Sequence, residues 1–201
     1  MITTAILTGD IVNSRETSPK IWLPYLKEGL NAYGKEPHHW EVYRGDSFQL
    51  ETIPERALEA AYFIKAILKQ KKGVDVRIAI GLGEKDYHSE KITESNGSAF
   101  VRSGECFQNL KKTNLALRSS TLEFDEILNL SLKLMALTAD NWLPATARVV
   151  KTTLANPEAS QKELVPILEK SQSTISEALL RAGYDELQQL LVFYKTKVTQ
   201  L

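Results

Sequence analysis

The chain has 201 residues, of which 43% are hydrophobic and 25% are charged. These proportions are ordinary for a globular protein that buries a core, and the length fits one large domain or one domain plus a small module. Basic and acidic residues both number 25, so the net charge is zero and no global field draws the chain to nucleic acid or to a membrane.

The first predicted element is a short buried strand at residues 5–7, which stops at Gly9-Asp10. A second Gly-Asp pair lies in the tight turn of residues 44–46, between two predicted strands at 40–43 and 47–50. Short β-rich runs broken in this way predict a β-hairpin. If the first strand lies beside this hairpin in one sheet, Asp10 and Asp46 approach each other at its end.

Asp10 and Asp46 allow two interpretations. Two neighbouring carboxylates repel each other unless a proton or a divalent cation lies between them. Oxygen ligands suit a hard ion such as Mg²⁺, which commonly takes one or two carboxylates plus substrate phosphates. The alternative is that both aspartates cap turns, a role that Asp fills well. The pattern alone leaves a metal site and two turn residues equally open.

Helices and strands alternate through the first 120 residues. Lys65, at the margin of the apolar stripe of the second predicted helix, is expected to reach water along its stem. In the next strand Arg77 alternates out of the apolar face. The remaining elements are helices from Pro19 to about Gly34, from Pro54 to about Lys72 and from Gly97 to about Lys111, and strands at 74–83 and 115–118.

The resulting order over residues 1–120 is β-α-β-β-α-β-α-β. It predicts an α+β domain of the ferredoxin-like class, a split β-α-β sheet with helices on one face. From Thr121 the pattern becomes helical throughout. We assign residues 121–143 to a connecting helix and residues 144–201 to an all-α module, in which Ser160 and Glu163 form a capping box.

Two segments of this module resemble the helix-turn-helix of bacterial transcription regulators. They are the runs 161–164 and 171–176, with a short turn between them. In that family the second helix enters the DNA major groove. Gln, Ser and Thr side chains can read base edges or hold phosphates. The resemblance implies contacts to DNA from the following residues: Gln172, Ser173, Thr174, Ser176, Glu177 and Arg181.

The charge of the module leaves its partner open. Seven basic and seven acidic residues fall between 140 and 201, whereas a DNA reader usually has a basic face. A net charge of zero over the module is compatible with one basic face, so we expect the module to bind DNA. Docking to a protein is the alternative. The last predicted helix, at 185–198, either packs on the module or pairs with a second copy in a homodimer.

The first 120 residues resemble the class III nucleotide cyclase fold, which is related to the GGDEF cyclases. The motifs that carry the resemblance are Asp10, Arg44-Gly45-Asp46-Ser47-Phe48, the strand 76–81 and Gly97-Ser98-Ala99-Phe100. In that fold two aspartates matching Asp10 and Asp46 hold two metal ions, helped by a backbone carbonyl at the place of Ile11. The resemblance thus implies a site for Mg²⁺ or Mn²⁺ and a nucleotide-type ligand.

The whole chain is similar to the SatD family of bacterial proteins through residues 7–15 and 44–48. One departure from the cyclase pattern concerns the helix after Gly97, where cyclases carry an Asn and an Arg that serve the transition state. Val101 and Glu105 stand at those places, and a Glu cannot stabilise phosphate charge. Cyclisation is therefore not expected, while metal and nucleotide binding remain open.

Three arginines are candidate phosphate partners, namely Arg15, Arg44 and Arg102. Each has an alternative interpretation as a solvated or salt-bridged surface residue. Gly45 and Gly97 belong to the motifs of the cyclase resemblance and complete the candidate ligand-binding set.

Cys106 is the only cysteine, so no internal disulfide can form and a reducing compartment is expected. No signal peptide or membrane span is recognised, so we expect a cytoplasmic protein without a membrane partner. The sequence favours a DNA-binding regulator that senses a nucleotide-type ligand. The alternatives are a metal-dependent nucleotidyl or phosphoryl transferase and a catalytically inactive domain that binds protein.

Overall fold

The computed structural model describes residues 2–110 and 113–201. The elements follow the predicted order, although the third helix ends at Gln108, and Lys111, its predicted end, lies outside the described residues. In chain order they are β1 (Thr4–Val12), α1 (Pro19–Asn31), β2 (Trp40–Tyr43), β3 (Ser47–Thr52), the 3₁₀ turn η1 (Pro54–Arg56), α2 (Ala57–Lys69), β4 (Asp75–Gly83), the 3₁₀ turn η2 (Ile92–Glu94), α3 (Ser98–Gln108), β5 (Leu115–Arg118), α4 (Leu122–Ala139), α5 (Pro144–Ala155), α6 (Gln161–Leu168), α7 (Gln172–Ala182) and α8 (Tyr184–Val198).

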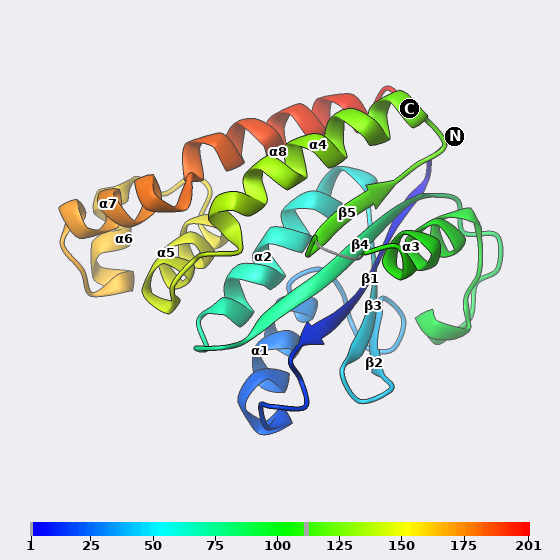
Figure 1. The fold of residues 1–201 in the computed structure, drawn as a ribbon, viewed down its shortest axis with the longest axis horizontal. Coiled ribbons are helices and arrows are strands. Elements are labelled where there is room, and N and C mark those ends of the chain that lie inside the picture. Colours follow the sequence, from blue (N-terminus) through cyan, green and yellow to red (C-terminus); the bar gives the residue numbers. More distant parts are fainter. Residues whose placement is uncertain (1, 111–112) are drawn as a thin grey trace.

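The predicted α+β class is confirmed, with one five-stranded mixed sheet in the order β2-β3-β1-β4-β5 (Figure 1). The central strand β1 is antiparallel to both β3 and β4, and β5 joins the edge parallel to β4. This register sets Asp10 opposite Ser47 of β3 and opposite Arg77 of β4. The end of β1 therefore meets the β2–β3 turn, as the sequence suggested.

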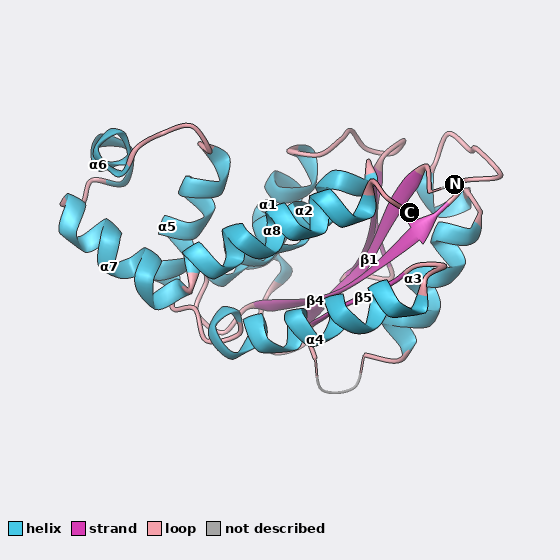
Figure 2. Cartoon of the chain, turned by 90° about the horizontal axis from the view of Figure 1, so that it is seen from above, coloured by secondary structure: helices cyan, strands magenta, loops and turns pink. Residues whose placement is uncertain are grey.

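Helices cover both faces of the sheet, so the prediction of helices on one face was wrong (Figure 2). The helices α1 and α2 lie on one face, whereas α3 lies on the other, over β1 and β4. The packing of α3 on this face depends on Gly81 of β4. A Cβ on Gly81 would lie only 2.2 Å from the carbonyl oxygen of Ala99 in α3. Because Gly81 has no side chain, the backbone of α3 can approach the strand closely.

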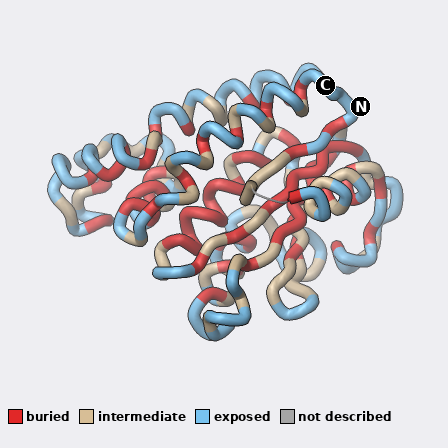
Figure 3. The backbone as a smooth tube through the Cα atoms, in the orientation of Figure 1, coloured by how far each residue is buried: buried red, intermediate tan, exposed pale blue. Residues whose placement is uncertain are grey.

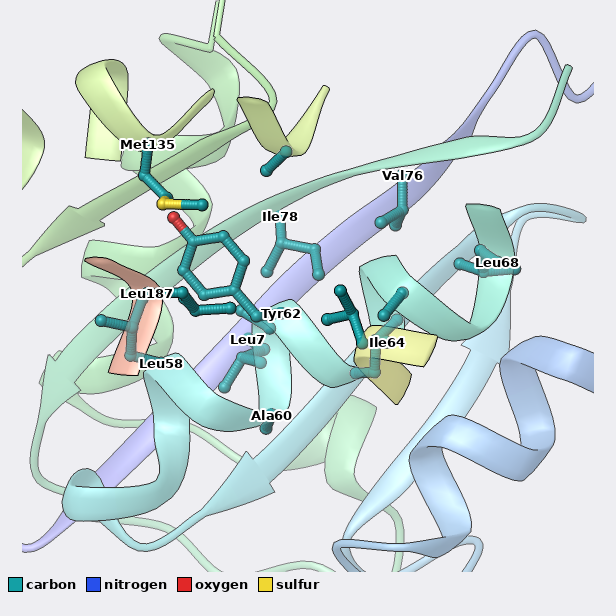
Figure 4. Close-up of a cluster of buried hydrophobic side chains, with 14 of the residues drawn as sticks. Leu7, Leu58, Ala60, Tyr62, Ile64, Leu68, Val76, Ile78, Met135 and Leu187 are labelled. Carbon is teal, nitrogen blue, oxygen red and sulfur yellow. The ribbon is translucent and has the colours of Figure 1, made fainter. Parts of the chain in front are cut away.

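One buried cluster runs from the sheet into the C-terminal helices (Figures 3 and 4). Figure 4 shows Leu7 of β1, Tyr62 of α2, Met135 of α4 and Leu187 of α8 converging in this core. The long helix α8 runs back beside α4, and the Tyr194 hydroxyl donates to the Pro54 carbonyl at 2.6 Å. The ranges 1–120, 121–143 and 144–201 are therefore joined by a continuous apolar core.

A buried ionic cluster links α2 to the segment after α4. Lys65 is only 3% exposed, and its Nζ lies 2.8 Å from Asp75 Oδ1 and 2.7 Å from Asp140 Oδ1. Lys69 Nζ bonds Asp75 and, at 2.7 Å, the Asp140 carbonyl. The expectation that Lys65 reaches water was wrong, because two carboxylates meet it inside the protein.

In the part of the chain that the structure describes, no helix combines the length and the apolar character that crossing a bilayer requires.

Candidate functional site

The end of β1 presents Asp10 on the face of the sheet that α3 covers. Thr8, two residues earlier, has its Oγ1 3.0 Å from Ser103 Oγ of α3, and alternate residues of a strand share a face. Gly9 between them has no room for a side chain, because a Cβ there would lie 2.7 Å from the carbonyl oxygen of Arg77. The Gly-Asp pair thus reflects tight packing at Gly9 and an outward carboxylate at Asp10.

Arg77 forms a bidentate ion pair with Asp10. Its Nε donates to Oδ1 at 2.9 Å and its Nη2 donates to Oδ2 at 2.5 Å, the fork geometry that suits a carboxylate. The hydrogen bonds to Asp10 raise the pKa of Arg77, burial opposes this change, and the negative charges of Asp10 and Asp46 support it. Arg77 is therefore the counter-charge of both aspartates.

Asp46 reaches the same place from the β2–β3 turn. Its Oδ2 accepts a hydrogen bond from the Ser14 hydroxyl. Together with Asp10, Arg15 and Arg77 it lines a pocket of about 500 Å³. The lining also includes Glu16, so three carboxylates and two guanidinium groups lie in one pocket, which suits a charged ligand rather than an apolar one.

Ile11, whose carbonyl the cyclase resemblance assigns to a metal, has its side chain in the core. Its N–H donates to the Asp46 carbonyl at 3.3 Å and ties the end of β1 to the hairpin turn. The chain then turns back at Asn13, which has a φ of 57°, a conformation that Asn tolerates. Arg15 follows on this turn, exposed to solvent and beside the pocket.

Arg44 and Gly45 form the tip of the hairpin turn, with φ values of 50° and 90°. The guanidinium of Arg44 lies 5.9 Å from the ring centre of Tyr43, outside the residues that line the pocket. Burial raises the pKa of Tyr43; the positive charge of Arg44 opposes this shift and Asp10 supports it. Tyr43 is thus part of the electrostatic surroundings of Asp10.

Asp10 and Asp46 offer the oxygen donors that a hard divalent cation prefers. Both carboxylate oxygens of Asp10 accept from Arg77, whose charge neutralises the pair as a cation would. The Arg77 side chain is 41% exposed, so it has room to turn into solvent and release them. Residues 2–110 and 113–201 hold no group of three or more His, Cys, Asp or Glu placed for a metal. These two carboxylates could hold a cation only if Arg77 turned away and water or phosphate completed the coordination.

Gly97 and Arg102 lie at the opposite end of the sheet. Gly97 packs against the preceding loop, where a Cβ would lie 2.3 Å from the carbonyl oxygen of residue 84. Arg102 donates to the Leu82 carbonyl at 2.6 Å. Leu82 pairs with Ala5, five residues along β1 from Asp10, which corresponds to about 16 Å of strand. The structure does not bring these two candidates to the aspartates.

The second candidate surface is the exposed side of α7, which packs against α5 and α6. Ser171 caps the helix, because its Oγ accepts from the Thr174 N–H at 3.2 Å. The inner side of α7 is buried through Ile175 and Ala182, among others. All six residues that the sequence assigned to DNA are exposed on the outside, namely Gln172, Ser173, Thr174, Ser176, Glu177 and Arg181.

The charge on this outer side is balanced. Arg181 lies 3.5 Å from Glu177, one turn earlier on the same helix. Such an exposed pair contributes little to stability, so its arginine is available to another partner.

The predicted capping box at the start of α6 is confirmed, with the Ser160 N–H donating to Glu163 Oε2 at 2.7 Å.

The sequence interpretation did not assign several residues of the carboxylate pocket and its surroundings to the site, among them Arg77, Ser14, Glu16 and Tyr43. The alternation of β4 placed Arg77 outside the apolar face, but only the pairing with β1 sets it opposite Asp10. The contact of Ser14 with Asp46 depends on the turn after β1, for which the local sequence carries no distinctive signal.

A scan against protein-family models gave no match, and a search of curated proteins gave none either. The similarity to the SatD family and to the cyclases therefore stays a prediction.

Proposed function

We propose that this protein is a DNA-binding regulator whose α+β part binds a nucleotide-type ligand together with Mg²⁺ or Mn²⁺. The observation that carries the DNA part is the capped, exposed N-terminal end of α7, where Gln172, Ser173 and Thr174 stand clear of the core. A helix that presents short polar side chains at its first turn suits insertion into the major groove. The unit α5–α6–α7 would then serve as the helix-turn-helix.

The test is retention of duplexes from a random pool on the full-length protein, followed by affinity measurements at several salt concentrations. Replacing Gln172 by Ala should cost about 1–3 kcal/mol on the selected sequence and relax its specificity. Thr196→Ala, an exposed position on α8, is the matched control and should bind as the wild type does. Failure of the pool to enrich at any salt concentration would reject DNA as the partner.

The ligand part of the proposal rests on the pocket at the end of β1. Asp10 and Asp46 would hold the cation, and Arg15 with Arg77 would meet phosphate oxygens. The bound metal would neutralise phosphate charge. The position of β1 between β3 and β4, antiparallel to both, supports a split β-α-β, cyclase-like arrangement of this part.

Thermal unfolding with a panel of nucleotides, with and without Mg²⁺ or Mn²⁺, tests this site. A ligand at about a hundred times its dissociation constant adds roughly 2.7 kcal/mol, or about 5 °C at this size. The shift should require the metal and should vanish in Asp10→Ala and in Asp46→Ala. A shift that survives both substitutions would place the ligand elsewhere.

A metal-dependent nucleotidyl or phosphoryl transferase is the second candidate, because two carboxylates share one pocket. Product analysis of the nucleotides that stabilise the protein separates the two functions. Turnover lost in Asp10→Ala would favour the enzyme, whereas binding without turnover favours the sensor.

A further inference from the structure

The outer face of α4 carries an apolar stripe that no other described part of the chain covers. Its members recur at the three- and four-residue spacing of a helix–helix contact. Leu137 is 72% exposed and Leu134 60% exposed, in a helix whose other side is buried. The complete stripe is Ile127, Leu130, Leu134 and Leu137.

The stripe continues onto the neighbouring helices. Leu134 borders a groove of about 480 Å³ that Leu180 of α7 and Leu190 of α8 also line. Leu180 is itself exposed, and at the other end of α4 Phe193 of α8 lies beside Ile127 in a second groove. Figure 1 shows α4 and α8 running side by side in opposite directions along this edge of the molecule. The apolar surface thus extends beyond one helix.

The positions in the stripe are symmetric about Leu132. Leu130 and Leu134 each lie two residues from it, and Ile127 and Leu137 each lie five residues from it. In an antiparallel pair of α4 helices centred there, Leu130 meets Leu134 of the other copy and Ile127 meets Leu137. A twofold interface requires this self-complementarity, since each surface must match itself.

Two opposite charges flank the stripe at equivalent helical positions. Glu126 precedes Ile127 and Lys133 precedes Leu134, so both stand on one flank of the stripe. Seven residues, or about 10 Å, separate them along the helix, which is too far for a pair within one chain. Both are exposed, and neither contacts an opposite charge among the residues that the structure describes. In the antiparallel pair centred on Leu132, Thr138 of the other copy lies directly opposite Glu126. Lys133 of the other copy lies five residues, or about 7.5 Å along the helix, from that point, on the same flank and within reach of two long side chains across the interface.

We propose that a second copy of this chain covers the stripe, so that the protein forms a twofold dimer through antiparallel α4 helices. Two ion pairs between Glu126 and Lys133 flank a core of eight aliphatic side chains, and Leu180 and Phe193 widen it. The inference does not depend on DNA or ligand binding, because no residue of the stripe belongs to the residues assigned to those functions. It sets one α7 at each end of the paired helices.

Sedimentation equilibrium of the full chain over a range of concentrations measures the association. The wild type should show a reversible monomer–dimer equilibrium. Leu134→Glu places one buried charge from each copy in the apolar interface. It should therefore raise the dissociation constant of the dimer by roughly 100-fold or more. Val192→Glu is the control, because Val192 is 64% exposed on another side of α8, and it should not change the equilibrium.

Charge exchange tests the register itself. Glu126→Lys or Lys133→Glu alone turns two attractions into two repulsions and should weaken the dimer by about tenfold. The double variant Glu126→Lys/Lys133→Glu restores both pairs and should recover wild-type association. An equimolar mixture of the two single variants should form a heterodimer more tightly than either forms a homodimer, because every flank then meets its opposite charge.

Circular dichroism confirms that each variant is folded, since all the altered positions are exposed. A wild type that stays monomeric at every concentration would overturn the proposal and leave the stripe to a different protein. Dimerisation that Leu134→Glu leaves intact would overturn the interface. Single charge variants that associate like the wild type, or a double variant that does not recover, would overturn the antiparallel register.

Discussion

Two aspartate clusters with cationic partners lie two residues apart on β4 and differ in burial. Asp75 belongs to the cluster with Lys65, Lys69 and Asp140, whose lysine ends are enclosed by protein. Arg77 belongs to the cluster with Asp10 and Asp46, on an open pocket. The Lys65 residue is 3% exposed, whereas the Arg77 side chain is 41% exposed.

The difference shows how similar chemistry serves either structure or binding. The Lys65 ammonium has almost no contact with water and depends on its carboxylate partners, so the buried cluster holds α2, β4 and the end of α4 in one arrangement. At the pocket, water and ligand atoms can take over, so Arg77 can exchange one partner for another at small cost. We therefore expect the buried cluster to control stability and the open cluster to control binding.

The largest effect should come from removing Lys65. Lys65→Ala leaves the carboxylates of Asp75 and Asp140 without their shared cation, and Lys69 compensates only in part. We expect a loss of about 3 kcal/mol in the free energy of unfolding, the lower end for a broken buried pair. Urea denaturation of the wild type and the variant measures it.

Lys151→Ala is the matched control. Lys151 also pairs with a carboxylate from another helix, with its Nζ 2.9 Å from Glu28 Oε1, but this pair is more open to water, with side chains that are 26% and 51% exposed. Its loss should cost less than about 1 kcal/mol. Equal effects of the two lysine substitutions would show that burial does not separate the two kinds of ion pair.

A smaller and opposite effect is expected at the open cluster. Arg77→Gln leaves Asp10 and Asp46 without their counter-charge, so Mg²⁺ alone should bind about tenfold more tightly. The same substitution should weaken binding of a nucleotide with Mg²⁺, because a phosphate partner is lost. Titrations that follow the metal-induced change in unfolding temperature measure both affinities.

Arg118→Gln serves as the control for this test, since Arg118 forms an exposed pair with Glu105 and does not line the pocket. It should leave both affinities unchanged. If Arg77→Gln weakens Mg²⁺ binding, Arg77 does not compete with the metal for the aspartates. The view that Arg77 exchanges its aspartate partners for a ligand would then be wrong.

The sequence predicted the elements well because the relevant signals are local. Alternation identified β4, and the capping box at Ser160 identified the start of α6. The face occupied by α3 was mispredicted, because it depends on the close approach of α3 to Gly81 across the sheet. The environment of Lys65 was mispredicted for the same kind of reason, since Asp140 reaches it from 75 residues away.

The candidate site shows the same division. Asp10 and Asp46 share one pocket, as the Gly-Asp motifs predicted on the condition that the first strand lies beside the hairpin. The predicted end of that strand at Gly9-Asp10 was wrong, because β1 continues to Val12. The partner Arg77 depends on the register between β1 and β4, which no local pattern reports. Arg102 shares the helical turn of a cyclase motif, yet the strand length between Leu82 and the pocket separates it from the aspartates.

The smallest effect, and the one that separates the two clusters most finely, concerns one tyrosine beside each. Burial raises the pKa of Tyr62, with a further contribution from Asp140. Burial also raises the pKa of Tyr43, where Arg44 opposes the shift and Asp10 supports it. Each folded pKa lies above the usual value of 10.0. The resulting stability is therefore complete below pH 10 and declines as pH rises through the folded pKa.

Unfolding free energies measured on both sides of pH 10 should show this decline, and Tyr62→Phe should flatten it more than Tyr43→Phe does. The reason is that Tyr62 is fully enclosed, whereas water reaches the half-buried Tyr43. Phenolate absorbance should accordingly include a Tyr43 component that titrates reversibly in the folded protein and a Tyr62 component that follows unfolding. If both tyrosines ionise reversibly before the protein unfolds, water reaches Tyr62 beside Asp140, and the buried cluster is more open than its geometry indicates.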